Sequence, residues 1–257
     1  MKNKMKPTSR LAALGVAALA VAGAGFTAQA QDDQWQFGVT VPLWAPQIDG
    51  NATLMGHQQN VHVSFSELKD HLDASFALGL EARKGKFGLY GDFGYMKFSA
   101  SGNVEGIPVD SQLKFVLANA GVSYQLIKTG SEHPFILEGT LGLRYWYTAT
   151  EFSAGGLSYG KERSLEDPMV GLRGSQYLTQ KFHLDFAGDI GGFAISDNQS
   201  TLDWSATGLV TYDFAKWFSL SGGYKALALN ASTGSGAGKN GVDLVFNGFV
   251  IAAKFKF

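Results

Sequence analysis

The chain has 257 residues, which is enough for one large domain, and no change in composition divides it. Charged residues make up only 17% of the chain and the formal net charge is −1, which gives no support for nucleic-acid binding. The absence of cysteine excludes a disulfide framework and a thiolate metal site.

The first thirty residues have the parts of a secretory signal peptide. Four basic side chains open the chain, those of Lys2, Lys4, Lys6 and Arg10. An Ala-rich apolar stretch follows at residues 11–26, and Ala28-Gln29-Ala30 fits a cleavage site. The alternative is an uncleaved anchor helix, although the apolar stretch is short and contains three glycines. We expect residues 1–30 to be removed, which takes the formal charge from −1 to −5 and leaves residues 31–257 as the mature domain.

From residue 34 onward, apolar and polar residues alternate with the period of two that is typical of a β-strand. In the first stretch, residues 34–45, Trp35, Phe37 and Val39 alternate with polar residues or glycine. The same alternation predicts further strands at residues 73–83, 87–99, 113–126, 135–147, 168–177, from 182, 202–214, 218–229 and 242–257.

The last stretch, residues 242–257, has an oily face that ends in Phe255 and Phe257 and carries Lys254 and Lys256 on its other face. One lipid face and one water face are typical of the wall of a transmembrane barrel. We therefore predict an all-β, antiparallel, up-and-down transmembrane barrel of about ten strands. Eight strands are the alternative, if two of the weaker stretches are not strands. The short connections would face the periplasm.

The lengths of the expected connections support an up-and-down barrel. Along the chain, short connections alternate with connections that are mostly longer. The short connections are at residues 84–86, 127–133, 178–181 and 215–217. The others are at residues 46–72, 100–112, 149–167, 194–201 and 230–241.

These features resemble the outer-membrane β-barrel domain of Gram-negative OmpA-like and OmpW-like porin-family proteins. More narrowly, four runs are similar to those of uncharacterised outer membrane barrel proteins: residues 41–45, 142–146, 167–173 and 188–193. The resemblance implies a place in the outer membrane, with membrane lipid and lipopolysaccharide around the barrel. It also implies that Phe257 is the signal read by the barrel assembly machinery. It carries no established reaction.

Polar side chains recur on the strand faces opposite the apolar ones, where they would face the lumen. This predicted lumen network consists of Glu81, Arg83, Asp92, Glu138, Arg144, Arg173, Asp185, Asp189 and Lys225. Two interpretations are open: the side chains line a solute path, or they form ion pairs that fill a narrow barrel. Because both signs of charge are present and buried charges need partners, we favour the filled barrel.

The histidines are the only candidates for chemistry. His183 and Asp185 share a lumen face, as a base and its orienting carboxylate would, but they would lie at the periplasmic end. His57, His62 and His71 lie in the first long connection, where a metal cluster is the weaker interpretation. Because no nucleophile elbow, phosphate loop or paired-carboxylate signature occurs, we expect no catalytic residue, no cofactor and no metal.

Ser64 and Glu67 have the spacing of a helix-capping box and predict a short helix at residues 64–72. Phe65, Leu68 and Leu72 would share one helix face, which must be buried against something. We expect this helix to act as a lid or plug at the extracellular opening. The alternative is a helix that covers only its own loop.

Together these features predict a monomeric outer-membrane β-barrel that is a structural protein or a narrow passive conduit for small solutes or ions. The alternative is an outer-membrane enzyme that modifies lipids or peptides, or a surface adhesin. The sequence names no solute, lipid or host ligand.

Overall fold

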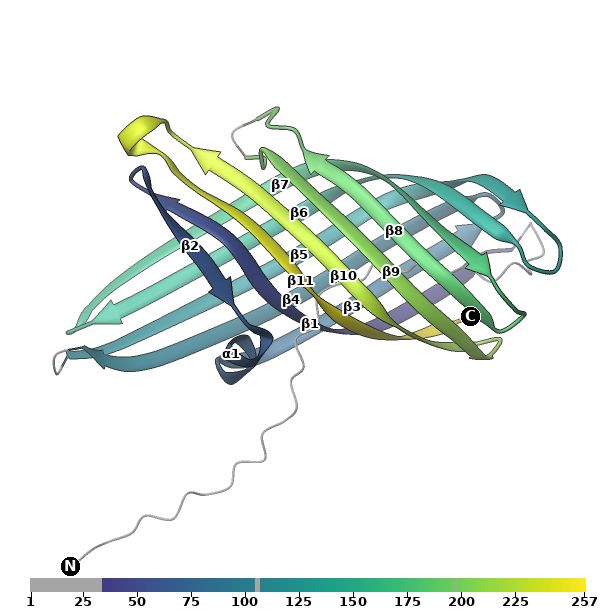
Figure 1. Cartoon of the computed structure of the whole chain (residues 1–257), viewed down its shortest axis with the longest axis horizontal. Coiled ribbons are helices and arrows are strands. Elements are labelled where there is room, and N and C mark those ends of the chain that lie inside the picture. The colour runs from purple at the N-terminus through teal and green to yellow at the C-terminus, as the bar shows by residue number, and fades with distance from the viewer. Residues whose placement is uncertain (1–33, 105–106, 197) are drawn as a thin grey trace, which may run out of the picture.

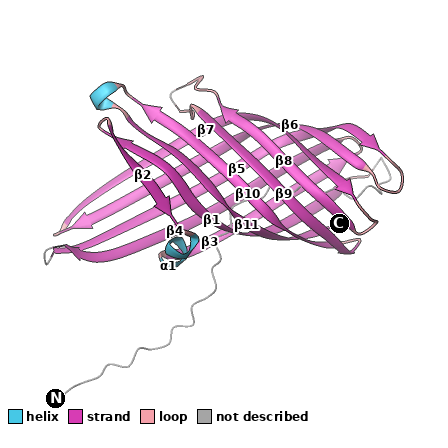
Figure 2. Ribbon diagram, viewed as in Figure 1, coloured by secondary structure: helices cyan, strands magenta, loops and turns pink. Residues whose placement is uncertain are grey.

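The computed structural model describes residues 34–104, 107–196 and 198–257, almost all of them in strands (Figures 1 and 2). The elements are β1 (Gln36–Leu54), β2 (His57–Val63), α1 (Phe65–Asp70), β3 (Leu72–Lys84), β4 (Phe87–Val104), β5 (Ile107–Thr129), β6 (Phe135–Ala154), β7 (Leu157–Tyr177), β8 (Phe182–Gly192), β9 (Leu202–Ala215), β10 (Phe218–Thr233), the 3₁₀ turn η1 (Gly236–Gly238) and β11 (Asn240–Lys256). The expected signal peptide at residues 1–30 lies outside the described residues.

The strands form one antiparallel sheet that closes on itself. From β3 to β11 each strand pairs with the next, and β11 pairs with β1. The closing contact is reciprocal: the Phe37 amide donates to the Phe257 carbonyl at 3.1 Å, and the Phe257 amide donates to the Phe37 carbonyl at 2.9 Å. β2 folds back on β1 alone. Within the described residues the barrel therefore has ten strands, which confirms the predicted fold and excludes the eight-stranded alternative.

The two ends of the barrel differ in their connections. At the end that we call the short-turn end, strands are joined by residues 85–86, 130–134, 178–181 and 216–217. Gly85, with a φ of 58°, makes the two-residue turn at residues 85–86 possible. At the opposite, long-hairpin end, β4 with β5 and β6 with β7 extend far beyond the rest of the wall (Figure 1).

Three of the five long connections expected at this end, at residues 46–72, 100–112 and 149–167, are largely wrong as connections, whereas the one expected at residues 194–201 does fall between β8 and β9. Most of residues 100–112 and 149–167 continue the strands, and β1 with β2 forms a further hairpin within residues 46–72. The alternating pattern fades there because both faces of the hairpins are exposed to water. The backbone groups still pair across each hairpin, since they need hydrogen-bond partners wherever the strand runs.

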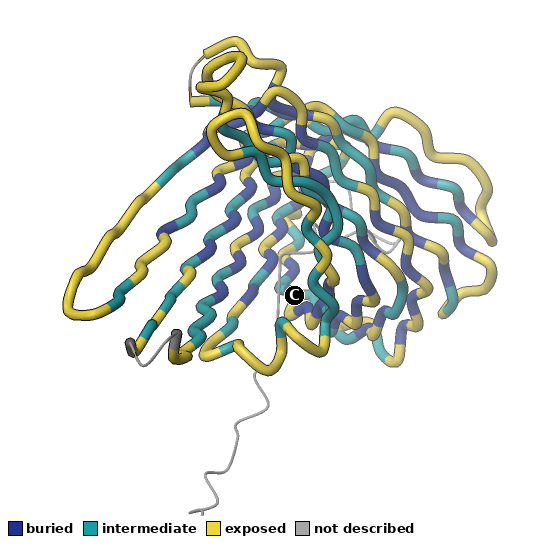
Figure 3. The backbone as a smooth tube through the Cα atoms, turned by 60° about the vertical axis from the view of Figure 1, so that its left-hand side comes forward, coloured by how far each residue is buried: buried dark blue, intermediate teal, exposed yellow. Residues whose placement is uncertain are grey.

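Buried residues alternate with more exposed ones along the strands, as the colours in Figure 3 show, which is the pattern of side chains that point to opposite faces of a wall. The outward face is a band of exposed apolar side chains, among them Phe37, Leu43, Phe76, Leu141, Leu172, Val210 and Ile251. The inward side chains are mostly buried. An apolar outer wall is the property that a transmembrane barrel requires.

None of the helices in the described ranges is both long and apolar enough to span a membrane.

The predicted short helix is confirmed as α1. Ser64 is its N-cap, and the Glu67 amide donates to Ser64 Oγ at 3.3 Å. In return, the Ser64 amide and hydroxyl both donate to Glu67 Oε2, at 2.8 and 2.7 Å. This full capping box satisfies donors at a helix end that is exposed to water.

Candidate functional site in the barrel interior

The barrel interior is filled by side chains in three layers along its axis. β6 shows the order: Glu138, Arg144 and Trp146 follow one another on the inward face from the short-turn end toward the long-hairpin end, and all three are buried. We call the layers, in this order, the first polar layer, the second polar layer and the apolar cluster.

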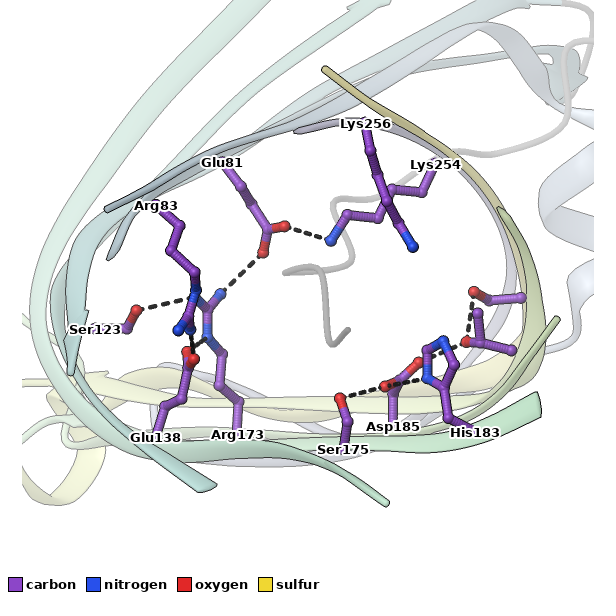
Figure 4. Close-up of polar contacts among 12 residues, drawn as sticks. Glu81, Arg83, Ser123, Glu138, Arg173, Ser175, His183, Asp185, Lys254 and Lys256 are labelled. Carbon is purple, nitrogen blue, oxygen red and sulfur yellow. Dashed lines mark hydrogen bonds and ion pairs between the residues drawn. The ribbon is translucent and has the colours of Figure 1, made fainter. Parts of the chain in front are cut away.

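Arg173 on β7 is the centre of the first polar layer. Its Nε donates to Glu138 Oε2 at 2.8 Å, its Nη1 donates to Glu81 Oε1 at 3.0 Å, and its Nη2 donates to Ser123 Oγ at 2.9 Å. These partners lie on β6, β3 and β5, so one guanidinium joins distant parts of the wall through the interior (Figure 4). Arg173 is itself buried, which makes these charged hydrogen bonds strong and their loss costly.

Two further cations complete this group of charges. Lys254 on β11 donates to Glu81, and Arg83 on β3 pairs with Glu138. Each carboxylate therefore has two cationic partners, Arg173 being common to both. The resulting chain of contacts runs from β11 through β3 to β7 and β6, and it crosses the interior near the short-turn end (Figure 4).

A second group in this layer surrounds His183, which is fully buried. Its Nδ1 lies 2.9 Å from Asp185 Oδ1, and its Nε2 lies 3.4 Å from Asp213 Oδ2. The ring also stacks on Tyr177, with centroids 4.6 Å apart. A histidine between two carboxylates forms ion pairs with them when its ring is protonated. A catalytic base would need a nucleophile at Nε2, and Asp213 faces that atom instead.

Both carboxylates beside His183 have additional partners. Asp185 accepts hydrogen bonds from Ser175 at 2.6 Å and from Thr211 at 2.5 Å. Asp213 accepts a hydrogen bond from Lys256 at 2.7 Å. Ser175 is hydrogen-bonded to the Asp185 carboxylate and not to the His183 imidazole. In a Ser-His-Asp triad the serine contacts the imidazole, so this group is not such a triad.

Arg144 on β6 is the centre of the second polar layer. Its Nε donates to Asn119 Oδ1 at 3.0 Å, its Nη2 donates to Asp189 Oδ1 at 2.7 Å, and its Nη1 lies 3.1 Å from Asp203 Oδ1. Asp203 also accepts a hydrogen bond from the Trp146 indole at 3.1 Å. This last contact connects the second polar layer to the apolar cluster.

Asp92 and Lys225 are also buried in the second polar layer. Lys225 Nζ lies 5.4 Å from the centroid of the Trp44 ring, within range of a cation–π interaction. A cavity of about 30 Å³ lies beside Lys225 and is lined by Tyr90 and Thr207, among others. It has room for only about two water molecules.

The apolar cluster fills the interior beyond the second polar layer. Its buried members are Trp44, Met96, Phe115, Leu117, Trp146, Leu165, Leu209, Leu227, Leu229, Ala231, Phe246 and Val250. The ring of Phe115 contacts those of Trp146 and Phe246, with centroids 5.7 and 5.9 Å apart. Apart from the two indole N–H groups, the side chains of the cluster carry no polar N–H or O–H groups.

A vestibule of about 1010 Å³ lies at the short-turn end of the barrel. Glu81, Tyr177, Asp213, Lys254 and Lys256 line its inner part, so it ends on the first polar layer.

Of the histidines expected in the first long connection, His62 has an acidic neighbour. His62 Nδ1 lies 2.6 Å from Asp49 Oδ1, and this hydrogen bond lowers the pKa of Asp49. Within residues 34–104, 107–196 and 198–257 no group of three or more His, Asp or Glu side chains could hold a metal ion. In the predicted helix, Phe65 packs against the apolar cluster, as does Leu72 just after the helix, and Leu68 is half-buried.

No known protein family matches the sequence, and no curated protein matches it. Solved structures do match its fold. The outer membrane protease OmpT of Escherichia coli is 10% identical, covers 90% of this chain and 100% of its own, and gives a TM-score of 0.51. The attachment invasion locus protein Ail of Yersinia pestis is 13% identical, with 87% and 99% covered and a TM-score of 0.40. An outer membrane channel of Pseudomonas putida is 10% identical, with 89% and 97% covered and a TM-score of 0.37.

The chain has the fold of a Gram-negative outer-membrane β-barrel. At 10% identity the likeness to the solved protease structure concerns the architecture and indicates no activity.

All nine side chains of the predicted lumen network lie inside this outer-membrane β-barrel, eight of them buried and Asp189 partly buried. Sequence reasoning missed Asp203 and Asp213 as members of the polar layers. Their signal was present in β9, where polar residues occupy five of the six alternate positions 203–213 on the face opposite the outward aromatic residues: Asp203, Ser205, Thr207, Thr211 and Asp213, with Leu209 as the apolar exception.

Proposed function

We propose that the protein is an outer-membrane β-barrel with a structural role, and that its lumen is closed. The long hairpins would lie outside the cell and the short turns in the periplasm. The observation that carries the proposal is the filled interior: two polar layers and the apolar cluster follow one another along the axis. Of the two roles expected from the sequence, a passive conduit is less compatible with such packing.

The proposal also covers how the protein is exported and assembled. We infer that residues 1–30 direct export and are removed, that the barrel assembly machinery reads Phe257, and that the folded protein is a monomer surrounded by membrane lipid and lipopolysaccharide. The apolar outer wall supports this placement, because it needs hydrocarbon around it. Intact mass of the purified protein, together with membrane fractionation, tests the placement. A product that keeps residues 1–30, or one found in the cytoplasm, would contradict it.

Planar-bilayer recording of the purified protein tests the closed lumen. We expect no stepwise conductance at physiological salt from protein whose fold has been verified by heat-modifiable gel mobility. Stepwise conductance from the folded protein would contradict the proposal and favour the narrow conduit.

A surface adhesin is the second candidate, because the long hairpins carry exposed apolar residues. Leu157 is 80% exposed and Tyr159 is 67% exposed near the end of the β6–β7 hairpin, and Leu54 with Met55 forms the exposed turn between β1 and β2. Apolar side chains in water are commonly found at protein interaction sites. Binding of whole cells that display the wild type or a Leu157→Ser, Tyr159→Ser variant to host matrix proteins tests this role.

A further inference from the structure

Two aspartates lie in contact where the second polar layer meets the apolar cluster. Asp167 on β7 and Asp203 on β9 each have an exposed fraction of 0%. Their strands are separated by β8, where Asp203 is paired with Gly191. A Cβ atom on Gly191 would lie 2.5 Å from Asp203 Oδ1, so the missing side chain leaves room for Asp203 to cross β8. The side chains of Asp203 and Asp167 are hydrogen-bonded to each other.

These two carboxylates have fewer partners than two negative charges need. Asp203 lies 3.1 Å from Arg144 Nη1, but the same guanidinium also pairs with Asp189. Asp167 accepts a hydrogen bond from the Ser200 amide at 2.7 Å through Oδ1. Among the described residues no donor reaches its Oδ2, and no cation forms an ion pair with it. Arg144 alone therefore does not neutralise this group of three carboxylates.

The contact between the two aspartates requires a proton. A carboxylate has no proton to donate, so two carboxyl groups form a hydrogen bond only when one of them is protonated. Two ionised carboxylates would repel each other, and burial raises this cost because no water screens the charges. A shared proton removes one negative charge and supplies the donor that Asp167 Oδ2 lacks. The other charged side chains of the layer are Arg144 on β6, Asp189 on β8, Asp92 on β4 and Lys225 on β10.

The acid pair lies beside the end of the connection between β8 and β9. The pairing of β7 with β8 ends at Met169, and beyond this point the connection becomes the neighbour of β7. The Ser200 amide donates to Asp167, and the Glu166 amide donates to the Asn198 carbonyl at 2.8 Å. These two hydrogen bonds hold residues 198–201 against β7, and one of them depends on the Asp167 carboxyl group.

The start of the same connection is strained. Phe193 has a φ of 70° and Ala194 a φ of 49°, in the left-handed region that residues other than glycine rarely adopt. Such a conformation persists where surrounding contacts hold it. Weaker contacts at residues 198–201 would therefore allow the strain to be released.

We propose that Asp167 and Asp203 share one proton, and that this acid pair is a pH-sensitive latch that holds residues 198–201 against β7. While the proton is present, the pair attracts and the connection stays on β7. Loss of the proton leaves two buried negative charges in contact, which favours release of the connection. The latch depends neither on a closed lumen nor on the membrane placement.

Infrared spectroscopy of the folded protein in detergent detects the shared proton, because the carbonyl stretch of a protonated carboxyl group differs from that of a carboxylate. At about pH 5 a free aspartate is mostly ionised. Asp167→Asn should lose the signal of one protonated carboxyl group, since the new amide N–H can donate to Asp203 in place of the proton. Asp185→Asn is the matched control and should keep the signal. Asp185 is 2% exposed, but its oxygens accept hydrogen bonds from Ser175 and Thr211.

Hydrogen exchange of the Ser200 amide tests the latch. The closed pair keeps a proton that an open pair releases above about pH 4, so the equilibrium for opening should rise by up to about tenfold per pH unit until the closed pair also loses its proton. After correction for intrinsic rates, we expect this amide to exchange at least about tenfold faster at about pH 8 than at about pH 5. In Asp167→Asn the dependence should disappear. The Gln125 amide, which donates to the Lys86 carbonyl at 2.9 Å, is the internal control and should not change with pH.

Equal carboxyl signals in the wild type and Asp167→Asn would overturn the shared proton. If Asp167→Asn does not fold, Asp203→Asn replaces it, because its amide N–H can donate to Asp167. The same corrected exchange of the wild-type Ser200 amide at both pH values would contradict the latch without any variant. Protection of this amide that is lost on adding a chelator, with no change in the carboxyl signal, would show a bound cation in place of the proton and would also overturn the proposal.

Discussion

Arg173 and Glu138 lie directly opposite each other on β7 and β6 and join their side chains inside the barrel, Nε to Oε2 at 2.8 Å. Without Arg173, the carboxylates of Glu138 and Glu81 would each keep a single cationic partner. Because charges buried in this way need their partners, we expect Arg173→Met to lower the free energy of unfolding by about 3–5 kcal/mol. Urea titration of the folded protein in detergent measures the change.

An exposed ion pair provides the control for this prediction. Lys114 and Glu151 lie 3.1 Å apart on the surface of the long hairpins, where water screens the charges. Lys114→Met should therefore cost no more than about 1 kcal/mol. If Arg173→Met costs no more than Lys114→Met, the first polar layer does not stabilise the barrel.

Trp146 tests the apolar cluster. Trp146→Ala should lower the free energy of unfolding by about 3–5 kcal/mol because it leaves a cavity among buried side chains. Trp146→Phe keeps most of the ring but removes the hydrogen bond to buried Asp203, and it should cost about 1–3 kcal/mol. Leu157→Ala, at an exposed hairpin position, should change stability by less than about 0.5 kcal/mol. Equal effects of the three substitutions in a denaturant titration would contradict the packed interior.

Phe257 closes the barrel with Phe37, and we propose that it also marks the chain for assembly. Deleting Phe257 removes both hydrogen bonds to Phe37, whereas Phe257→Ala keeps them and removes only the aromatic ring. If the assembly machinery reads the ring, both variants should give less heat-modifiable protein in cells. Phe257→Ala should nevertheless refold from urea into detergent micelles as the wild type does. Normal yield of Phe257→Ala in cells would restrict Phe257 to barrel closure.

The capping box of α1 predicts a dependence on pH. The hydrogen bonds from Ser64 lower the pKa of Glu67 below its ordinary value of 4.5. A carboxyl group with a lowered folded-state pKa stabilises above its unfolded pKa, and the contribution is lost as the pH falls through the folded value. The amides of residues 64–72 should therefore exchange hydrogen faster below about pH 4 than at pH 7, after correction for intrinsic rates.

Glu67→Gln is the control for this effect, since its side chain has no charge to titrate. Its corrected exchange should be insensitive to pH over the same range. A wild-type helix with the same corrected exchange at both pH values would show that the Glu67 carboxylate does not hold α1 in place.

Several features of this protein follow from its sequence alone. The alternation of Trp35, Phe37 and Val39 with polar residues, repeated along the chain, predicts the strands and their inward and outward faces, because a strand has an exact side-chain period of two. The Ser64 and Glu67 spacing predicts α1, because a capping box is local chemistry. Assignment of Glu81 and Arg173 to the interior needs only this same period.

The tertiary structure decided which inward side chains meet. Arg173 on β7 contacts Glu81 on β3 across three intervening strands, and Lys254 contacts the same carboxylate from β11. These pairings depend on the shear with which the sheet closes. The length of the hairpins was also not predictable, because a strand with water on both faces has no apolar period to mark its end. Pro42 and Pro46 are also visible in the sequence, but only the register shows that they follow directly on the end of the β1–β3 pairing at Thr40, while β1 stays paired with β11.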